Sequence, residues 1–482
     1  MRLFVISDLH LGGRPHTDAG PMGSQICHSY TELTAFIDWV RNQANAPSSV
    51  ELVLNGDIVD FLMEDDHGEG NPASPWLPDQ KLVIEKLKSI IMRTREEGNY
   101  GPFDAMAALL NDGQHLTFIL GNHDIELSLP AVRHFLEEQL GGGVRFRFIY
   151  DGEAYVRGDL LIEHGNRYDS WNIIDHSALR EARSLMSRGM GARINQSPEA
   201  FVPPPGSFMV INVINKIKSS YRFVDLLKPE SAAVLPILLA LHPRLEHALA
   251  ATLQAYSQSS NKFVSPAQPK HSGQLSTDEQ ASIPSLAGDL RHVLGAAAAT
   301  KFPVQPTGYG ELSAAESVAN LLELSKNIRD YITDAAGVFS EKTAGARDEL
   351  LRIGFDTWRG KLACNETREV SPYREAAEEL AKEGKFNCVI FGHTHLPKRE
   401  IMDVDNRSVV YINTGTWTDT MHIPYELLEP TPAARARFRV FISDLKNNKL
   451  SDYLERRLSF ADITLNSDRV VSATLNQFTM SK

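Results

Sequence analysis

The chain has 482 residues, of which 42% are hydrophobic and 23% are charged, and its formal net charge is −12 at pH 7. A chain of this length and composition is expected to bury a large core and to form more than one structural unit. The composition therefore suits a soluble enzyme.

Cysteines and apolar stretches exclude several other classes. The three cysteines (Cys27, Cys364 and Cys388) are odd in number and lack C-x-x-C spacing, so neither a disulfide framework nor a thiolate zinc site is indicated. Only a brief apolar run precedes Asp8, so a cleaved signal peptide is not expected. The most apolar stretch, 232–241, is too short to span a bilayer and is interrupted by a proline. A cytoplasmic location fits best.

The first two predicted strands each end in metal-ligand residue types. Asp8 and His10 follow the apolar run 2–7, and Asp57 follows the run 50–55. Residues two apart in a strand share a face, so Asp8 and His10 are placed to converge on one ion. The carboxylate of Asp57 has two oxygens, which makes it the natural bridge between two ions.

Three later runs repeat this pattern, in which a predicted strand ends and a ligand-type side chain follows. They are the run 115–120 before Asn122, the run 160–163 before His164, and the run 386–391 before His393 and His395. An α/β sheet presents side chains to ligands where its strands end. Carboxylate, amide and imidazole donors in this number suit two divalent ions, an arrangement typical of hydrolytic sites.

The motif order D-x-H, G-D, G-N-H-D, H and G-H-x-H resembles that of the calcineurin-like metallophosphoesterase superfamily, over roughly residues 1–169 and 385–445. The resemblance implies two sets of metal ligands, which share one residue. The first metal would be held by Asp8, His10, Asp57 and His395, and the second by Asp57, Asn122, His164 and His393. It also implies that His123, supported by Asp124, stabilises or protonates the leaving oxygen.

Phosphoesters resist hydrolysis because their own negative oxygens repel a nucleophile. Two divalent cations neutralise that charge and supply hydroxide at neutral pH. Mn²⁺ is expected first, with Fe²⁺ and Zn²⁺ as alternatives, because Asp, Asn and His donors suit all three. The predicted enzyme is a metal-dependent phosphoric ester hydrolase that cleaves a phosphodiester, phosphomonoester or pyrophosphate bond.

Within this superfamily the chain is similar to a bacterial branch that includes the UDP-2,3-diacylglucosamine pyrophosphohydrolases of lipid A synthesis. The likeness is carried by three stretches, 121–124, 164–169 and 411–417. The resemblance implies a phosphorylated small-molecule or lipid-linked substrate. Those enzymes are much shorter and carry only a small helical insertion near the site.

Three residues after His164 are candidate substrate contacts: Asn166, Arg167 and Asp169. A guanidinium such as that of Arg167 suits a phosphate oxygen, and the alternative is a salt-bridged loop. Trp417, after a turn-like stretch, either approaches the substrate or packs in the core.

The spacing of the ligands locates an insertion. His164 and His393 are 229 positions apart, whereas the earlier ligands are separated by 42 to 65 positions. We therefore expect a phosphoesterase domain in two parts, 1–169 and 385–482, interrupted by an insertion at 170–384. A lid, a dimer surface and a partner site are all open roles for it, so an oligomer is one expectation.

The insertion is expected to be mostly helical. Ser313-Ala-Ala-Glu316 forms a capping box that opens a helical pattern to about Ala336, and Ser371-Pro372 places an N-cap before a proline at the first helical position. Outside the insertion, strands alternate with helical stretches at 31–42 and 80–95. This order predicts an α/β fold with two packed sheets and helices outside, and the resemblance implies a four-layer αββα sandwich.

Charge bears on the substrate. The range 170–384 carries 23 basic and 24 acidic residues, so nearly all of the net negative charge lies in the metal-binding part. The chain lacks the broad basic footprint of a protein that grips duplex DNA through many phosphates. A metal-dependent nuclease similar to the double-strand-break repair phosphoesterases is therefore the second hypothesis, and a non-catalytic scaffold is the third.

Overall fold

The computed structural model describes most of the two expected phosphoesterase segments and a few short stretches between them. The described residues are 1–14, 24–63, 76–95, 99–169, 172–196, 201–204, 206–207, 210–215, 222–227, 351–352, 355, 369, 373–429 and 431–480. They belong to two compact units. The first comprises Met1–Ser207, Asn365–Asp419 and Arg456–Lys482, and the second comprises Phe208–Cys364 and Thr420–Glu455.

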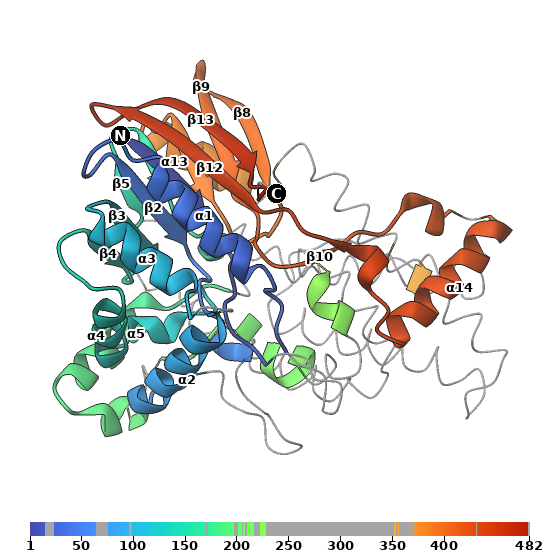
Figure 1. The fold of residues 1–482 in the computed structure, drawn as a ribbon, viewed down its shortest axis with the longest axis horizontal. Helices are drawn as coiled ribbons and strands as arrows, with labels where there is room; N and C mark the ends of the chain where they lie inside the picture. The colour runs from blue at the N-terminus through green and yellow to red at the C-terminus, as the bar shows by residue number, and fades with distance from the viewer. Residues whose placement is uncertain are drawn as a thin grey trace, which may run out of the picture. The chain divides into compact units, whose positions relative to one another are not determined.

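The first unit contains a six-stranded sheet in the order β13-β12-β1-β2-β3-β4 (Figure 1). Its strands are β1 (Arg2–Ile6), β2 (Val50–Asn55), β3 (His115–Ile119), β4 (Phe146–Ile149), β12 (Ser459–Asn466) and β13 (Arg469–Gln477). Neighbouring strands in the series β1-β2-β3-β4 pair in parallel. At the β1 edge, β12 pairs antiparallel with β1, and β13 pairs antiparallel with β12. The carboxyl ends of β1, β2 and β3 therefore lie side by side.

A second sheet of five strands has the order β5-β6-β7-β9-β8. Its strands are β5 (Tyr155–Arg157), β6 (Leu160–Ile162), β7 (Cys388–Phe391), β8 (Lys398–Val404) and β9 (Arg407–Asn413). The strands β6, β7 and β9 run parallel to one another. This pairing brings the ends of β6 and β7, which are far apart in the sequence, next to each other.

Alternation along β1 explains how the two sheets pack. Leu3 and Val5 belong to a core cluster that also contains Ile162 and Ile390 of the second sheet. Phe4 and Ile6 point to the opposite face and join a cluster formed with the helices. Since successive side chains of a strand point to opposite faces, one strand contributes to both cores.

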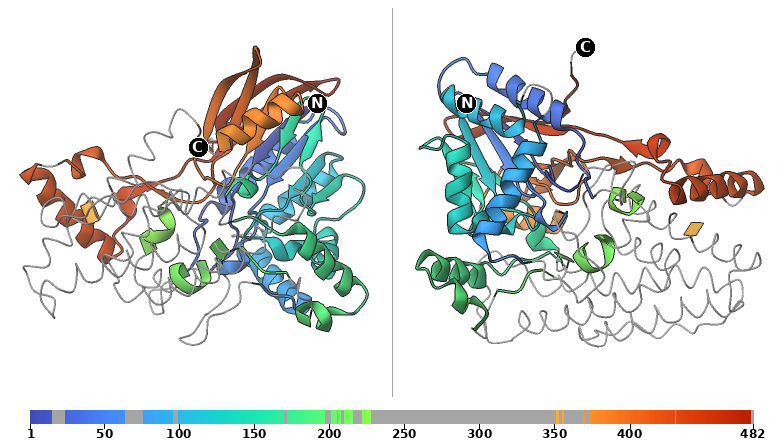
Figure 2. Two further views of the ribbon diagram at one scale, coloured as in Figure 1. Left: turned by 180° about the vertical axis from the view of Figure 1, so that it is seen from behind. Right: turned by 60° about the horizontal axis from the view of Figure 1, so that its bottom comes forward.

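Helices cover the outer faces of both sheets. The first sheet packs with α1 (Tyr30–Asn42), α2 (Gln80–Arg93), α3 (Pro102–Asn111), α4 (Pro130–Gln139) and α5 (His176–Ser187). The helix α13 (Tyr373–Glu383), orange in the left view of Figure 2, contacts β7 and β8 of the second sheet. The expected α/β fold with an αββα layer order is thus confirmed.

Short helical turns complete the first unit. They are η1 (Phe61–Met63), η2 (Ile125–Ser128), η3 (Asn166–Tyr168) and η4 (Gly191–Gln196). Two of them, η2 and η3, directly follow the expected ligand motifs at Asn122 and His164.

The second unit includes α14 (Pro432–Lys446), whose N-cap Thr431 accepts a hydrogen bond from the backbone of Ala434. Its buried Phe441 ring lies against Phe355. The other elements of this unit are η5 (Val210–Ile214), η6 (Arg222–Leu226), η9 (Tyr425–Leu427), η10 (Ser451–Tyr453) and the strand pair β10 (Thr420–Met421) and β11 (Leu454–Glu455).

These units do not coincide with the division expected from the sequence. The helices α5 and α13 fall within the expected insertion, 170–384, yet they belong to the first unit. The reason is apolar packing: α5 buries Leu179 in the helix-side core, and α13 buries three alanines beside the second sheet. The capping box at Ser313–Glu316 and the N-cap at Ser371-Pro372 lie outside the described residues.

No helix among the described residues is both long enough and apolar enough to cross a membrane.

Candidate metal centre

The expected ligands lie in loops that follow five strands of the two sheets. The loops after β1 and β2 are joined by backbone hydrogen bonds from Asp8 N to Gly56 O (3.1 Å) and from His10 N to Asp57 O (2.9 Å). The loops after β6 and β7 are joined by a bond from Gly392 N to His164 O (2.9 Å). Backbone hydrogen bonds just beyond the strand ends therefore hold the two loops of each pair together.

Five of the expected ligands have a left-handed backbone. The φ angles are 54° for Asp8, 45° for His10, 51° for Asp57, 67° for His393 and 61° for His395. A residue with a Cβ atom pays about 1 kcal/mol or more for this conformation, although Asp and His adopt it more readily than most residues. Strained conformations that recur at one site indicate that the surrounding structure holds these side chains for a function.

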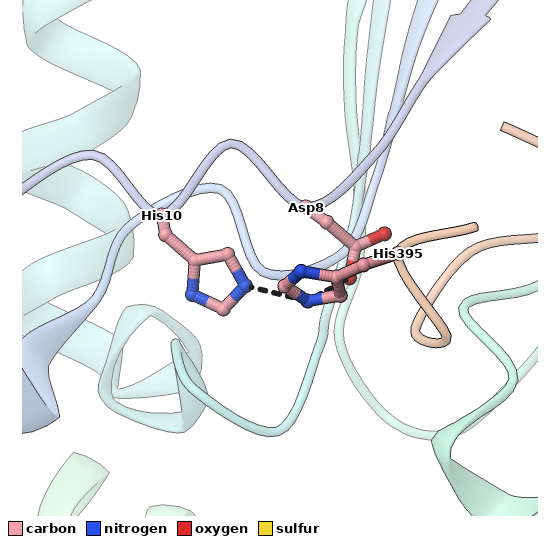
Figure 3. Close-up of side chains that lie close together, drawn as sticks. All are labelled: Asp8, His10 and His395. Atoms are coloured by element: carbon pink, nitrogen blue, oxygen red, sulfur yellow. Dashed lines mark hydrogen bonds and ion pairs between the residues drawn. The ribbon is translucent and has the colours of Figure 1, made fainter. Parts of the chain in front are cut away.

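The first cluster contains Asp8, His10 and His395 (Figure 3). Nε2 of His395 lies 3.2 Å from Nε2 of His10 and 3.3 Å from Oδ1 of Asp8. All three side chains are buried, with at most 6% of each residue exposed. Three ligand-type atoms at such separations, supplied by two loops, form a suitable set for one cation.

The second cluster contains Asp57, His164 and His393. Oδ2 of Asp57 lies 3.2 Å from Nε2 of His164, and the same oxygen lies 3.8 Å from Nε2 of His10 in the first cluster. Asp57 thus contacts both clusters, which is the position that the sequence predicts for a bridging ligand.

The two carboxylates are oriented by backbone N–H groups. Oδ2 of Asp8 accepts from His393 N (3.0 Å), and Oδ1 of Asp57 accepts from His123 N (2.9 Å). In each case the other oxygen faces the imidazoles. One oxygen therefore anchors the side chain while its partner is presented to the site.

The imidazoles are oriented in a similar way. Nδ1 of His10 lies 2.9 Å from Oδ2 of Asp60, and Nδ1 of His164 lies 2.8 Å from the backbone oxygen of Asn55. Both acceptors require a proton on Nδ1, so the lone pair of each neutral ring lies on Nε2, the atom that faces Asp57.

Asn122 also fits a cation site. Asn122 is buried, and its Nδ2 donates a hydrogen bond to Oδ1 of Asn172 (3.3 Å). Oδ1 of Asn122 has no hydrogen-bond partner within the described part of the chain, and there Oδ1 of Asp8 and Nε2 of His164 make no hydrogen bond beyond their contacts with His395 and Asp57. Buried polar atoms are normally hydrogen-bonded, so these three acceptors are suited to coordinate divalent cations.

Electrostatics keep the carboxylates charged. Burial would raise the pKa of Asp8, but the charges of His395 and His164 outweigh it and lower that pKa to about 2. Burial likewise opposes ionisation of Asp57, and the neighbouring charges of His164 and His123 hold its pKa well below the usual range. Both carboxylates are therefore ionised at neutral pH, as cation binding requires.

Nδ1 of the His123 ring contacts the carboxylate of Asp60, a residue that the sequence motifs did not predict for the site. Oδ2 of Asp60 lies 3.0 Å from Nδ1 of His123 and also contacts His10. Burial opposes the charge of Asp60, but the charge of His123 outweighs it and holds the pKa of this carboxyl far below its usual range. The signal was present in the sequence as the second aspartate of Gly56-Asp-Ile-Val-Asp60.

Asp124, expected to support His123, has different contacts. Its Oδ1 accepts from Gly121 N and its Oδ2 accepts from Ile58 N, both at 2.7 Å. Burial and the nearby charge of Asp57 raise its pKa to about 7. Asp124 therefore ties the loop after β2 to the loop after β3, while the carboxylate against Nδ1 of His123 is that of Asp60, and support of His123 by Asp124 stays a prediction.

The three candidate substrate residues make contacts within the protein. Arg167 pairs with Glu163 (3.2 Å) and donates to the backbone oxygen of Gly152 (2.5 Å), which is the salt-bridged loop of the alternative interpretation. Asn166 donates to Asn172 O (2.9 Å). Oδ2 of Asp169 lies 3.1 Å from Nε2 of His393. A role for these residues in binding substrate stays a prediction.

Trp417 lies in the core. Its side chain is fully buried, its ring packs against Phe36, and Nε1 donates to Ser459 O (3.0 Å). The core-packing interpretation is therefore correct, because both the ring and its one donor are satisfied internally.

Glycines open two of the motifs because the ligands approach their backbone closely. A Cβ atom on Gly121 would lie 2.1 Å from Oδ1 of Asp57, and one on Gly56 would lie 2.4 Å from the His164 ring. Only glycine leaves room for these side chains.

Residues 1–199 match the family model described as calcineurin-like phosphoesterase. Members of this family are metal-dependent phosphoric ester hydrolases, so the expected enzyme class is confirmed. The matched range contains every expected site residue except His393 and His395, which the second sheet brings to the same site. A search of curated proteins found no match.

Proposed function

We propose that this chain is a dinuclear metal-dependent hydrolase that cleaves a phosphodiester or pyrophosphate bond of a small or lipid-linked substrate, with phosphomonoesters as the remaining bond type. The position of Asp57 carries the proposal, because its Oδ2 contacts an imidazole of each cluster. The residues that would hold the first cation are Asp8, His10, Asp57 and His395, and those for the second are Asp57, Asn122, His164 and His393.

When bound, two divalent cations neutralise phosphate charge and supply hydroxide at neutral pH. The chain's own residues provide the remainder of the mechanism. Asp8 and Asp57 contribute the negative charge that retains the cations, and their second oxygens are anchored by the backbone. Because these anchors form before substrate arrives, the site needs little reorganisation during the reaction.

We propose that His123 acts on the leaving group. The Asp60 carboxylate accepts a hydrogen bond from the protonated Nδ1 of His123. This bond fixes the ring and leaves Nε2 as the atom that would exchange a proton with substrate. With both ring nitrogens protonated, His123 would donate its Nε2 proton to the departing oxygen, so that a strongly basic alkoxide does not leave unprotonated, and would become a neutral imidazole with its remaining proton on Nδ1.

Metal removal and replacement test this function. The protein is stripped of metal, restored with Mn²⁺, Fe²⁺ or Zn²⁺ singly, and assayed with mono- and diester model compounds, nucleotides, nucleic acids and lipid-linked pyrophosphates. We expect turnover of a diester or pyrophosphate that requires added metal, with Mn²⁺ the most effective. Asp57→Asn should lose turnover, whereas Asp112→Asn, on an exposed side chain paired with Arg41, should retain it.

Other results would favour the other hypotheses. Metal-dependent cleavage of DNA or RNA in preference to small substrates would favour the nuclease. Failure of every substrate after metal replacement would favour the scaffold. The similarity to UDP-2,3-diacylglucosamine pyrophosphohydrolases stays a prediction, which the lipid-linked pyrophosphates in the panel address.

A further inference from the structure

Asn172 lies between two of the expected ligands of the second cation. Its Oδ1 is 3.3 Å from Nδ2 of Asn122, and its own Nδ2 donates to Oδ2 of Asp169 at 2.7 Å. That same oxygen of Asp169 lies 3.1 Å from Nε2 of His393. A continuous series of polar contacts therefore runs from Asn122 through Asn172 and Asp169 to His393.

The carboxylate determines the polarity of this series. An ionised carboxylate only accepts hydrogen bonds, so Asp169 requires a donor from each neighbour. Asn172 meets this requirement by turning its NH₂ group toward Asp169, which leaves its carbonyl oxygen on the other side. The carbonyl oxygen of Asn172 can only accept a hydrogen bond. The group of Asn122 that faces it is therefore the NH₂ group.

The consequence for Asn122 is that its Oδ1 is left for the cation. Oδ1 is buried and has no hydrogen-bond partner in the described residues. With the amide turned the other way, an NH₂ group would face the cation, and an NH₂ group is not a metal ligand. Asn172 thus decides which end of the Asn122 amide is available.

The same carboxylate decides the tautomer of His393. Nε2 of His393 must carry a proton to donate to Asp169, so the lone pair of the neutral ring lies on Nδ1. Carboxylates that fix ligand imidazoles in this way are common around metal sites. One carboxylate therefore sets the ligand atom of His393 and, through Asn172, that of Asn122.

The position of Asn172 is itself fixed by hydrogen bonds of its backbone. Its N–H donates to Asp169 O at 2.8 Å, and its C=O accepts from Nδ2 of Asn166 at 2.9 Å. The side chain is thus held in place without a contribution from a cation. This also gives Asn166 a purpose in the site that requires no contact with substrate.

We propose that Asn172 is a positioning residue for the second cation, which, together with Asp169, directs Oδ1 of Asn122 and Nδ1 of His393 toward that cation. The inference rests on the dinuclear site of the proposed function. It adds a residue that coordinates nothing itself.

Manganese titration tests the proposal. The purified metal-free protein and Asn172→Ala are titrated with Mn²⁺ by calorimetry, and the products are examined by electron paramagnetic resonance. Wild type should bind two ions and show a spin-coupled pair. In Asn172→Ala the second dissociation constant should rise about 10–100-fold, the first should change little, and the spectrum at one to two equivalents should be that of isolated Mn²⁺ ions.

Two further variants make the test specific. Asn387→Ala removes an equivalent bond, from Asn387 Nδ2 to Asp159 Oδ2 (2.7 Å), away from the ligands, and should leave both ions bound. Asp169→Asn keeps nearly the same side-chain shape, but its NH₂ group can donate a hydrogen bond toward Asn172. It should therefore raise the dissociation constant of the second ion, as Asn172→Ala does. Melting temperatures of the metal-free proteins check that each variant is folded.

The outcomes separate this inference from the function on which it rests. Two normal manganese affinities and a spin-coupled spectrum in folded Asn172→Ala would overturn the positioning role and leave the dinuclear hydrolase intact. Wild-type protein that binds no pair of ions would overturn both. Equal weakening by Asn387→Ala would also overturn the proposal, since the effect would then be general.

Discussion

The Asp60 carboxylate contacts Nδ1 of His123 at 3.0 Å, although 63 positions separate the two residues along the chain. The neighbour of His123 in the sequence, Asp124, instead accepts hydrogen bonds from two backbone N–H groups. The two buried carboxylates thus have separable contacts, one with the imidazole that we propose acts on the leaving group and one that holds two loops together.

Substitution of each carboxylate by its amide should separate these roles. Asp60→Asn should lower kcat at saturating metal by about 10–100-fold, because His123 and His10 lose the charged acceptor that orients them. The measurement is steady-state turnover of the best substrate from the panel, with thermal unfolding of the same preparations.

Asp124→Asn should act mainly on stability. Both carboxylate oxygens accept a backbone N–H, so an amide places one NH₂ group against a donor, at a cost of about 1–3 kcal/mol in the free energy of unfolding. Denaturant unfolding of the metal-free protein measures this cost. A large loss of kcat with unchanged stability would instead restore Asp124 as the partner of His123.

Gly121 should tolerate no side chain. A Cβ atom there would lie 2.2 Å from the backbone nitrogen of Asp57 and closer still to its carboxylate, so Gly121→Ala must displace the bridging ligand. We expect loss of metal-dependent turnover and of paired Mn²⁺ binding. Gly191→Ala is the matched control, because no atom lies within 4 Å of a Cβ at that position. Wild-type activity in Gly121→Ala would contradict the loop geometry.

The pH dependence of stability should include a contribution from Glu126. Burial raises the pKa of its carboxyl from the ordinary 4.5 to about 7, although Oε1 accepts from Leu77 N (3.2 Å). Because the folded pKa is the higher one, the protonated form favours folding at low pH. That contribution is complete below pH 4.5 and is lost as pH rises to 7.

Glu126→Gln should remove this dependence, since the amide oxygen still accepts from Leu77 and never ionises. Relative to wild type, the variant should be more stable above pH 7 by up to about 3 kcal/mol and equally stable below pH 4.5. Urea unfolding of metal-free protein across this range provides the measurement. A stability difference that does not vary with pH would show that Glu126 titrates normally.

A buried ion pair at the first residue of β8 should contribute more to the free energy of unfolding than a surface pair does. Nζ of Lys398 lies 2.6 Å from Oε1 of Glu369, and both side chains are at most 2% exposed. Lys398→Met should cost about 3–5 kcal/mol, because it leaves a buried carboxylate without its cation. Lys88→Met, which removes an exposed pair with Glu85, should cost under about 1 kcal/mol. Equal losses of the free energy of unfolding in the two variants, measured by urea unfolding, would contradict the larger contribution of the buried pair.

The sequence by itself determined the nature of the site. The expected metal ligands follow apolar runs at Asp8, Asp57, Asn122, His164 and His393, and the runs became β1, β2, β3, β6 and β7 within one or two residues of their expected bounds. Strand periodicity and ligand chemistry are local properties, so they can be read from neighbouring residues. The two-sheet fold followed from the same alternation.

Tertiary structure alone decided which polar group contacts which. Asp60 rather than Asp124 meets His123, and Asn172 reaches Asn122 across 50 positions, because loops from different strands converge at one edge of two sheets. The allocation of α5 and α13 to the first unit likewise depends on apolar packing with distant strands. Such contacts are set by the relative placement of strand ends, which no local pattern of residues specifies.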